Sequence, residues 1–172
     1  MSAIAIKVGR KKQSEKRQSL IESLWDKETL DSTPIWNRLK QDGYTTLPRT
    51  MPQIHAIMDV LAEKGKPLSG VYLSLWCNVF DEGFLEVKDK ERFAFEAGFS
   101  GQRAVTTWLI RMKKLEELGF IKSKEGASGP FNYLLLVNPL SVIKKVYETR
   151  PKDQLYNALI GRMSEVGAKF DE

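Results

Sequence analysis

The sequence predicts a mainly α-helical protein with a small β-hairpin. Apolar residues recur at helical spacing in several segments, and glycine and proline residues separate these segments from one another. Two strand-like runs lie on either side of a Gly126 to Gly129 tip, which is the pattern of a hairpin. With 42% apolar and 10% aromatic residues, the 172-residue chain has a globular composition. We therefore expect one compact domain with appendages.

The net charge of +5 is concentrated at the amino terminus. The first 20 residues carry six basic side chains and one acidic side chain, which accounts for the whole excess. Residues 1–13 are therefore predicted to form a basic arm, and Arg10, Lys11 and Lys12 are its candidate phosphate contacts. Such side chains release counterions from a polyanion and bind it without reading sequence. A solvated, partly disordered terminus explains the same pattern.

Cysteine and histidine usage excludes two kinds of site. Cys77 is the only cysteine, so no disulfide can form within the chain, and its apolar surroundings in the sequence place it in the core. His55 is the only histidine, which excludes the usual cysteine and histidine spacing of zinc sites. No apolar run is long enough to span a membrane, and the first residues do not have the pattern of an export signal. We expect a cytoplasmic protein without a cofactor.

The first third of the chain predicts three helices joined by turns. From residue 14, apolar side chains recur at helical spacing. Thr33 followed by Pro34 is the start signal of a short helix that ends at Gly43, and Thr50 starts a third helix. Residues 14–66 are accordingly predicted to be an N-terminal helical extension.

Residues 67–97 predict a buried helix, a brief strand and a second helix. Ser69 is a suitable N-cap for a run that is apolar around its whole circumference and therefore belongs in the core. Phe84 to Val87 mixes apolar and polar residues as a short strand does. The helix that follows has Asp89 as its cap, and Gly98 breaks it.

The next helix bears most directly on function. It is predicted to run from Ser100, its N-cap, to Leu118, with Gly119 closing it. The hairpin spans residues 120–137. Further helices are expected near residues 140–147 and 154–163, and the C-terminal region 140–172 that contains them is a candidate for dimerisation.

This order of helix, short strand, helix, turn, longer helix and hairpin resembles the winged helix-turn-helix domain of bacterial and mobile-element regulators and replication initiators. The resemblance covers residues 67–139, under half of the chain, and is most specific from Ser100 to Ile121. The sequence departs from the family at Ala104, where threonine is frequent, and at Thr107, where a basic residue is frequent. The resemblance implies a helix that enters the major groove of DNA and a wing that lies along the sugar-phosphate backbone.

Placing residues at 100° intervals gives the predicted helix two different sides. One side is apolar and is expected in the core: Val105, Trp108, Leu109, Met112 and Leu115. The other side has few of the glutamates and lysines that usually coat a solvated helix. Its side chains match those that read base edges, and the candidates are Gln102, Arg103, Thr106, Thr107 and Ile110. The alternative is an ordinary exposed helix side.

Within this set, Arg103 suits guanine, Gln102 suits adenine, and Ile110 suits the methyl group of thymine. Phosphate contacts are expected from the helix start and from lysines farther along it: Ser100, Gly101, Lys113 and Lys114. Lys122 and Lys124 precede the hairpin tip and are candidate phosphate contacts of the wing. Lysine on an edge strand also discourages aggregation, so this last signal has two interpretations.

These observations favour a sequence-specific double-stranded DNA-binding protein that regulates transcription by equilibrium binding. Two alternatives remain open: a plasmid or phage replication-initiation or maintenance protein, and a winged-helix module that binds proteins. The protein-binding alternative is raised because residues 21–172 carry no net charge, whereas a tight DNA binder is usually strongly basic. An enzyme is not expected, because the sequence has no P-loop, dinucleotide turn, zinc spacing or Ser/His/Asp set. The extra helices at both ends suggest a homodimer.

Overall fold

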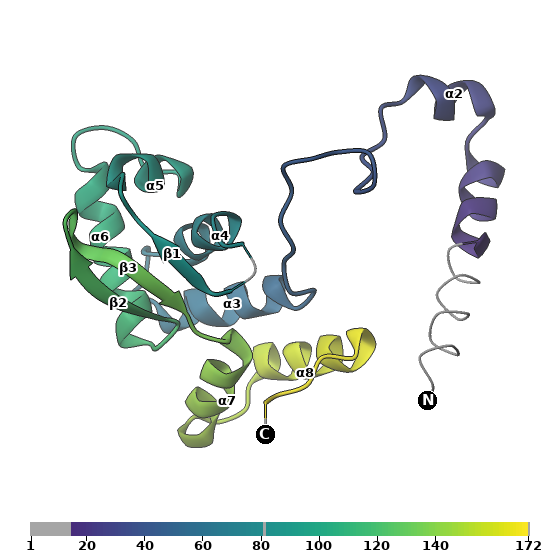
Figure 1. Cartoon of the computed structure of the whole chain (residues 1–172). Helices are drawn as coiled ribbons and strands as arrows, with labels where there is room; N and C mark the ends of the chain where they lie inside the picture. Colours follow the sequence, from purple (N-terminus) through teal and green to yellow (C-terminus); the bar gives the residue numbers. More distant parts are fainter. Residues whose placement is uncertain (1–14, 81, 172) are drawn as a thin grey trace. The chain divides into compact units, whose positions relative to one another are not determined.

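The computed structural model describes residues 15–80 and 82–171 and divides the chain into two units, Met1–Tyr44 and Thr45–Glu172. Helices predominate in the described residues, together with one small antiparallel sheet (Figure 1), so the prediction of a mainly helical fold with a hairpin is confirmed. Among the described residues, no helix is both long enough and apolar enough to cross a membrane.

The first unit contains two short helices and no buried side chain among residues 15–44. The first helix covers residues 15–24, and the second is α2, Lys27–Ser32, whose N-cap Asp26 accepts a hydrogen bond from the backbone amide of Thr29 (2.7 Å). The helix predicted from Thr33 to Gly43 is wrong. Thr33 is extended (φ −89°, ψ 120°), because the residue before a proline avoids the helical region, and Pro34 therefore follows a helix end.

The second unit contains the remaining elements in the order that the sequence predicts, helix, helix, strand, two helices, hairpin and two helices. Their bounds are α3 Met51–Leu61, α4 Ser69–Cys77, β1 Phe84–Glu86, α5 Lys90–Glu96, α6 Ala104–Glu117, β2 Ile121–Gly126, β3 Gly129–Leu136, α7 Pro139–Thr149 and α8 Gln154–Val166.

The sheet has three antiparallel strands in the order β1, β3, β2. Phe84 of β1 lies opposite Leu135 of β3, and Lys122 of β2 lies opposite the same residue on its other side. Because side chains alternate between the two faces of a strand, this register also fixes which residues face the core. Leu85 and Leu134 face inward and are 5% and 1% exposed.

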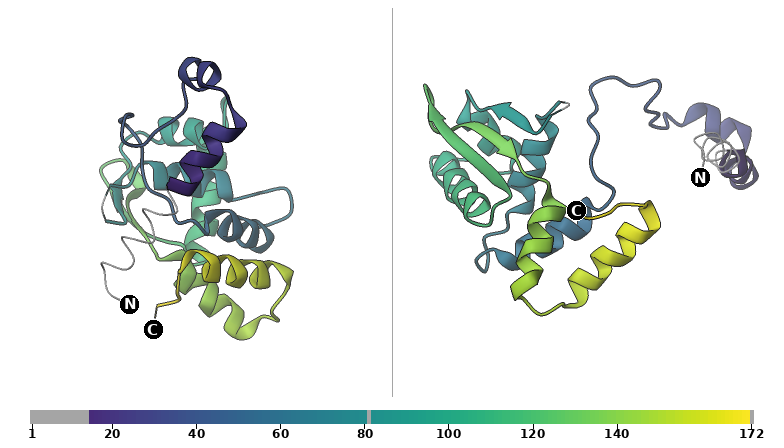
Figure 2. Two further views of the ribbon diagram at one scale, coloured as in Figure 1. Left: turned by 90° about the vertical axis from the view of Figure 1, so that its right-hand side faces the viewer. Right: turned by 60° about the horizontal axis from the view of Figure 1, so that its bottom comes forward.

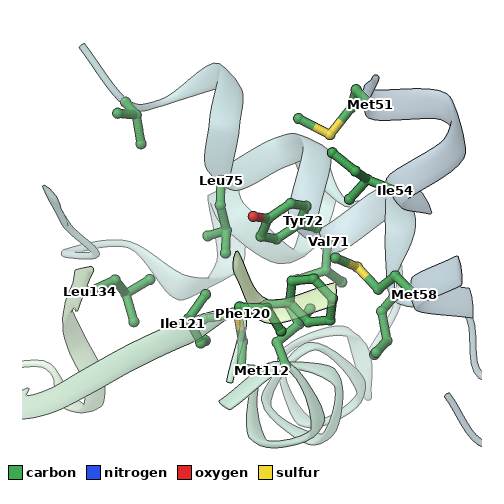
Figure 3. Packing of buried hydrophobic residues seen from close by; sticks show 14 of the residues in the cluster. Met51, Ile54, Met58, Val71, Tyr72, Leu75, Met112, Phe120, Ile121 and Leu134 are labelled. Atoms are coloured by element: carbon green, nitrogen blue, oxygen red, sulfur yellow. The ribbon is translucent and has the colours of Figure 1, made fainter. Parts of the chain in front are cut away.

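The core lies between the inner face of the sheet and the helices of the second unit (Figure 3). Tyr72 of α4 occupies its centre and packs edge-on against Phe120, with 5.7 Å between the ring centroids. Residues from α3 and α6 surround this pair, including Ile54, Met58 and Met112. The prediction that the α4 segment lies in the core is confirmed for Val71, Tyr72 and Leu75, whereas Leu73 on its other side is 37% exposed. Cys77, expected in the core, is exposed at the end of α4.

Helices α3, α7 and α8 pack together in the same unit (Figure 2). Ile143 of α7 and Leu159 of α8 are fully buried in the common core, as is Ile57 of α3. The predicted extension 14–66 therefore spans both units, because α3 belongs to the second unit. The predicted C-terminal region 140–172 contributes α7 and α8 to the core of that unit.

Polar contacts fix the start of α4 against α3. The carboxylate of Asp59 accepts hydrogen bonds from the backbone amides of Leu68 (2.7 Å) and Ser69 (2.9 Å) and from the Ser69 hydroxyl (2.7 Å). The sequence indicated Ser69 as the cap of α4, but Asp59 of α3 supplies this cap.

His55 of α3 packs edge-on against Tyr72, and burial lowers the pKa of His55 below the usual 6.5.

Candidate nucleic-acid interface

Helix α6 begins at Ala104, four residues later than predicted. Gly101 has a left-handed backbone (φ +79°), and the Ala104 amide donates to the Gly101 carbonyl (3.1 Å), so the segment before α6 is a turn. Ser100 is therefore not the N-cap, and Arg103 occupies that position. The Arg103 side chain is exposed and forms no ion pair with another described residue, so its guanidinium is available for other contacts.

The apolar side of α6 anchors the helix in the unit. Trp108, Met112 and Leu115 are fully buried, and Leu109 and Val105 pack against the same core. The predicted stripe is confirmed. Since this side is fixed by the core, the opposite side of α6 has a defined position.

The opposite side of α6 and the turn before it are exposed together. Arg103, Thr106 and Lys113 are exposed, and Ile110 keeps 49% of its surface in solvent. Thr107 is half-buried, as is Lys114, whose ammonium group lies 3.5 Å from the carboxylate of Glu117. The turn adds three further exposed residues, which are Ser100, Gly101 and Gln102. We call this set the α6 surface; it unites nine of the candidate residues predicted from the sequence.

A groove of about 280 Å³ borders the α6 surface on the side of the loop between α3 and α4. Ile110 and Lys113 line it, together with Lys66 of the loop and Leu68. The Lys66 ammonium group hydrogen-bonds the Glu63 carboxylate and thereby lowers the pKa of Glu63, and the more distant charges of Lys114 and Arg111 act in the same direction. Lysines from two segments therefore lie along one border of the α6 surface, together with Glu63 and Glu117, which pair with Lys66 and Lys114.

Arg111 was not singled out by the sequence analysis, although it lies in the same groove. Its side chain is 9% exposed, with the guanidinium 5.9 Å from the centroid of the Phe99 ring. On the helical wheel, Arg111 lies at the edge of the buried stripe, between the apolar side and the exposed side of α6. This position is the sequence signal that indicates its burial. Its positive charge adds to that of the neighbouring lysines.

The hairpin places Lys122 and Lys124 away from the α6 surface. Glu116 of α6 accepts hydrogen bonds from the backbone amide (2.9 Å) and hydroxyl (2.7 Å) of Ser123, which shows that the Ser123 side of β2 faces α6. Since neighbouring side chains in a strand point to opposite faces, both lysines project from the outer face of the sheet. The structure does not bring them together with the candidate residues of α6.

The hairpin tip is held against the start of α5. The Lys90 ammonium group donates to the carbonyl of Ser128, and the Ser128 hydroxyl donates to the carbonyl of Val87 (2.9 Å). The buried Asn132 amide donates to the same carbonyl (3.0 Å). The tip therefore has a fixed position relative to the start of α5.

The remaining predicted contacts, Arg10, Lys11 and Lys12, lie outside the described residues. Within residues 15–80 and 82–171, no group of histidine, cysteine and acidic residues has an arrangement that would hold a metal ion. No protein-family profile matches the chain, and neither a curated protein nor a solved structure shows significant similarity to it.

Proposed function

We propose that this protein is a sequence-specific double-stranded DNA-binding regulator that reads the major groove with the α6 surface. One observation carries the proposal. A helix fixed in the core by Trp108 and Met112 exposes an arginine, hydroxyls and a half-exposed isoleucine on its other side. A helix with this arrangement fits a groove about 12 Å wide, whose floor presents hydrogen-bonding groups and methyl groups.

Each exposed side chain then has a partner in the groove. Arg103 and Gln102, at the leading end, reach base edges first and suit guanine and adenine. Thr106 donates or accepts a hydrogen bond, and Ile110 contacts a thymine methyl group, which is a more favourable environment than water for its exposed half. Lys113 lies toward the border of the α6 surface and pairs with a phosphate.

The order of elements from α4 to β3 supports assigning this part of the chain to the winged helix-turn-helix class. In that assignment α5 and α6 form the helix pair, and β2 with β3 forms the wing. The tip of the hairpin, rather than Lys122 and Lys124, is then the part of the wing nearest to the duplex.

Residues 15–44 support the further proposal that the protein binds DNA as a homodimer. They carry seven large apolar side chains that are 46–86% exposed: Leu20, Leu24, Trp25, Ile35, Trp36, Leu39 and Tyr44. The six-residue helix α2 is too short to be stable in water unless it packs against something. A second copy of the chain that covers these side chains would remove them from water, and a homodimer interface is apolar in the same way.

A salt series tests the proposal. Binding of a fluorescein-labelled random duplex should weaken steeply with salt, with a log-log slope of about −0.9 per phosphate contacted. Deleting residues 1–13 removes Lys7, Arg10, Lys11 and Lys12, so the slope should become shallower by about 3.6. Fluorescence anisotropy between 50 and 300 mM salt measures both, with a deletion that removes only residues 1–6 as the control. A slope near zero for the intact chain would contradict DNA binding.

A further inference from the structure

The outer face of the sheet carries an arrangement that neither the core nor the α6 surface uses. Its side chains form two rows across the three strands, and the register fixes their order. The first row is Phe84, Leu135 and Lys122, and the second row is Glu86, Tyr133 and Lys124. We call these six residues the aromatic-lysine face.

The apolar members of this face are exposed although the core is complete without them. Phe84 is 52% exposed, Leu135 51% and Tyr133 37%, whereas Leu85, Asn132 and Leu134, next to them in the strands, are buried. The rings of Phe84 and Tyr133 are nearly parallel, with an angle of 14° and 6.5 Å between their centroids. The two rings therefore stack on each other, and each keeps part of its surface in solvent.

The Tyr133 ring lies close to Gly126 across the hairpin. A Cβ atom added at Gly126 would lie 2.1 Å from Oδ1 of Asn132 and 2.5 Å from Cε2 of the Tyr133 ring, so this packing requires glycine at position 126.

The charges on this face are positive. Lys122 and Lys124 are exposed, and neither takes part in an ion pair with any other described residue. Glu86, the one acidic member, is paired with Lys88 at 3.1 Å. The aromatic surface is thus bordered by two available cations.

We propose that the aromatic-lysine face binds single-stranded DNA, with bases stacked on Phe84 and Tyr133 and phosphates paired with Lys122 and Lys124. Stacking needs free base faces, which a duplex does not offer because its bases stack on each other. An apolar protein partner would bury both lysines, and this face has no available carboxylate to pair with them. Removing the two charges from water would therefore cost free energy. Phosphates supply the matching charge. This inference rests on different residues from those of the proposed function.

Stacking and phosphate pairing do not themselves select between deoxyribose and ribose. We choose DNA as the ligand because the other proposed surface of the same unit contacts DNA.

Fluorescence anisotropy with a 5′-fluorescein-labelled (dT)₂₀ strand and the full-length chain tests the inference. Phe84→Leu and Tyr133→Leu should each weaken binding roughly tenfold, since each stacked base contributes about 1–3 kcal/mol. The double variant Lys122→Gln with Lys124→Gln should make the log-log salt slope shallower by about 1.4, since each phosphate contact to a single strand contributes about 0.7. Phe95→Leu is the matched control, because Phe95 is a 75% exposed aromatic residue on α5.

The inference is overturned if (dT)₂₀ does not bind, or if the Phe84 and Tyr133 variants bind it as well as the Phe95 control does. It is also overturned if Arg103→Ala abolishes strand binding while the Phe84 and Tyr133 variants retain it. A change in oligomeric state of the Phe84 variant, measured by sedimentation, would assign the face to a protein contact instead. A labelled (rU)₂₀ strand that binds more tightly than (dT)₂₀ would contradict the choice of DNA. Circular dichroism spectra confirm that each variant is folded.

Discussion

Replacing Trp108 with alanine is expected to lower the free energy of unfolding by about 3–5 kcal/mol. The side chain is fully buried in α6, and its ring lies 6.2 Å from that of Phe93 in α5 and 6.4 Å from that of Phe131 in β3. It therefore connects both helices to the hairpin. Since domains of this size are stable by only about 5–15 kcal/mol, the variant would lose a large part of its stability.

Urea unfolding followed by circular dichroism at 222 nm measures this effect. Trp108→Phe is the control, because phenylalanine keeps an aromatic ring in the site and removes an indole N–H that is buried without a hydrogen-bond partner among the described residues. It should cost clearly less than the alanine variant. A loss below about 1 kcal/mol for Trp108→Ala would show that α6 is not anchored through this residue.

Replacing Arg103 with alanine is expected to weaken binding to a preferred duplex about 10- to 100-fold, because a bidentate contact to guanine is worth about 1–3 kcal/mol. Binding to unrelated duplexes should change much less, so that the preference itself is reduced. The preferred duplex is obtained by selecting bound sites from random DNA. For a homodimer, the selected sequence should contain two half-sites about 34 Å apart or a multiple of that distance.

Two control variants separate base recognition from charge. Arg103→Lys keeps the positive charge but loses the planar, two-pronged donor group, so it should also lose the preference. Lys145→Ala removes an exposed charge of α7 and should bind like the unchanged protein. Equal weakening on preferred and unrelated duplexes would show that Arg103 contacts phosphate and not a base.

Helix boundaries could be predicted from the sequence where a cap acts locally. Asp89 caps α5 by accepting from the Arg92 amide (2.9 Å), as its position indicated. The prediction failed at Ser100, because the left-handed Gly101 interposes a turn, and at Thr33, because the Asp26 cap had already started a helix that ends there. A serine or threonine marks a helix start only when the following backbone can continue as a helix.

The two sides of α6 could also be predicted, since burial follows the helical period. The grouping of the other candidates could not, because it depends on pairing between distant segments. The strand register assigns Lys122 to the same face as Phe84, although 38 positions separate them in the chain. The border of the α6 surface likewise depends on Lys66, which comes from a loop before α4.

The two proposals assign a duplex and a single strand to different surfaces of one unit. The α6 surface and the aromatic-lysine face are separated by the sheet, whose inner side contacts α6 through Ser123 and Glu116. A protein with both activities would hold paired and unpaired DNA near each other, and replication initiation by a plasmid or phage protein requires this combination. Strand binding by the aromatic-lysine face would therefore favour this alternative over transcription regulation alone.

Cleavage of DNA from a chemical group attached to α6 tests whether the α6 surface enters the duplex. Cys77, the only cysteine, is first replaced by serine, and Thr106→Cys then allows an iron chelate to be attached to the exposed side of α6. Asn157→Cys, at an exposed position of α8, is the matched control. We expect hydroxyl radicals from position 106 to cut the selected duplex within a few base pairs of the guanine assigned to Arg103, and none from position 157. Uncut DNA with the chelate at position 106, or equal cutting from both positions, would contradict recognition of DNA by α6.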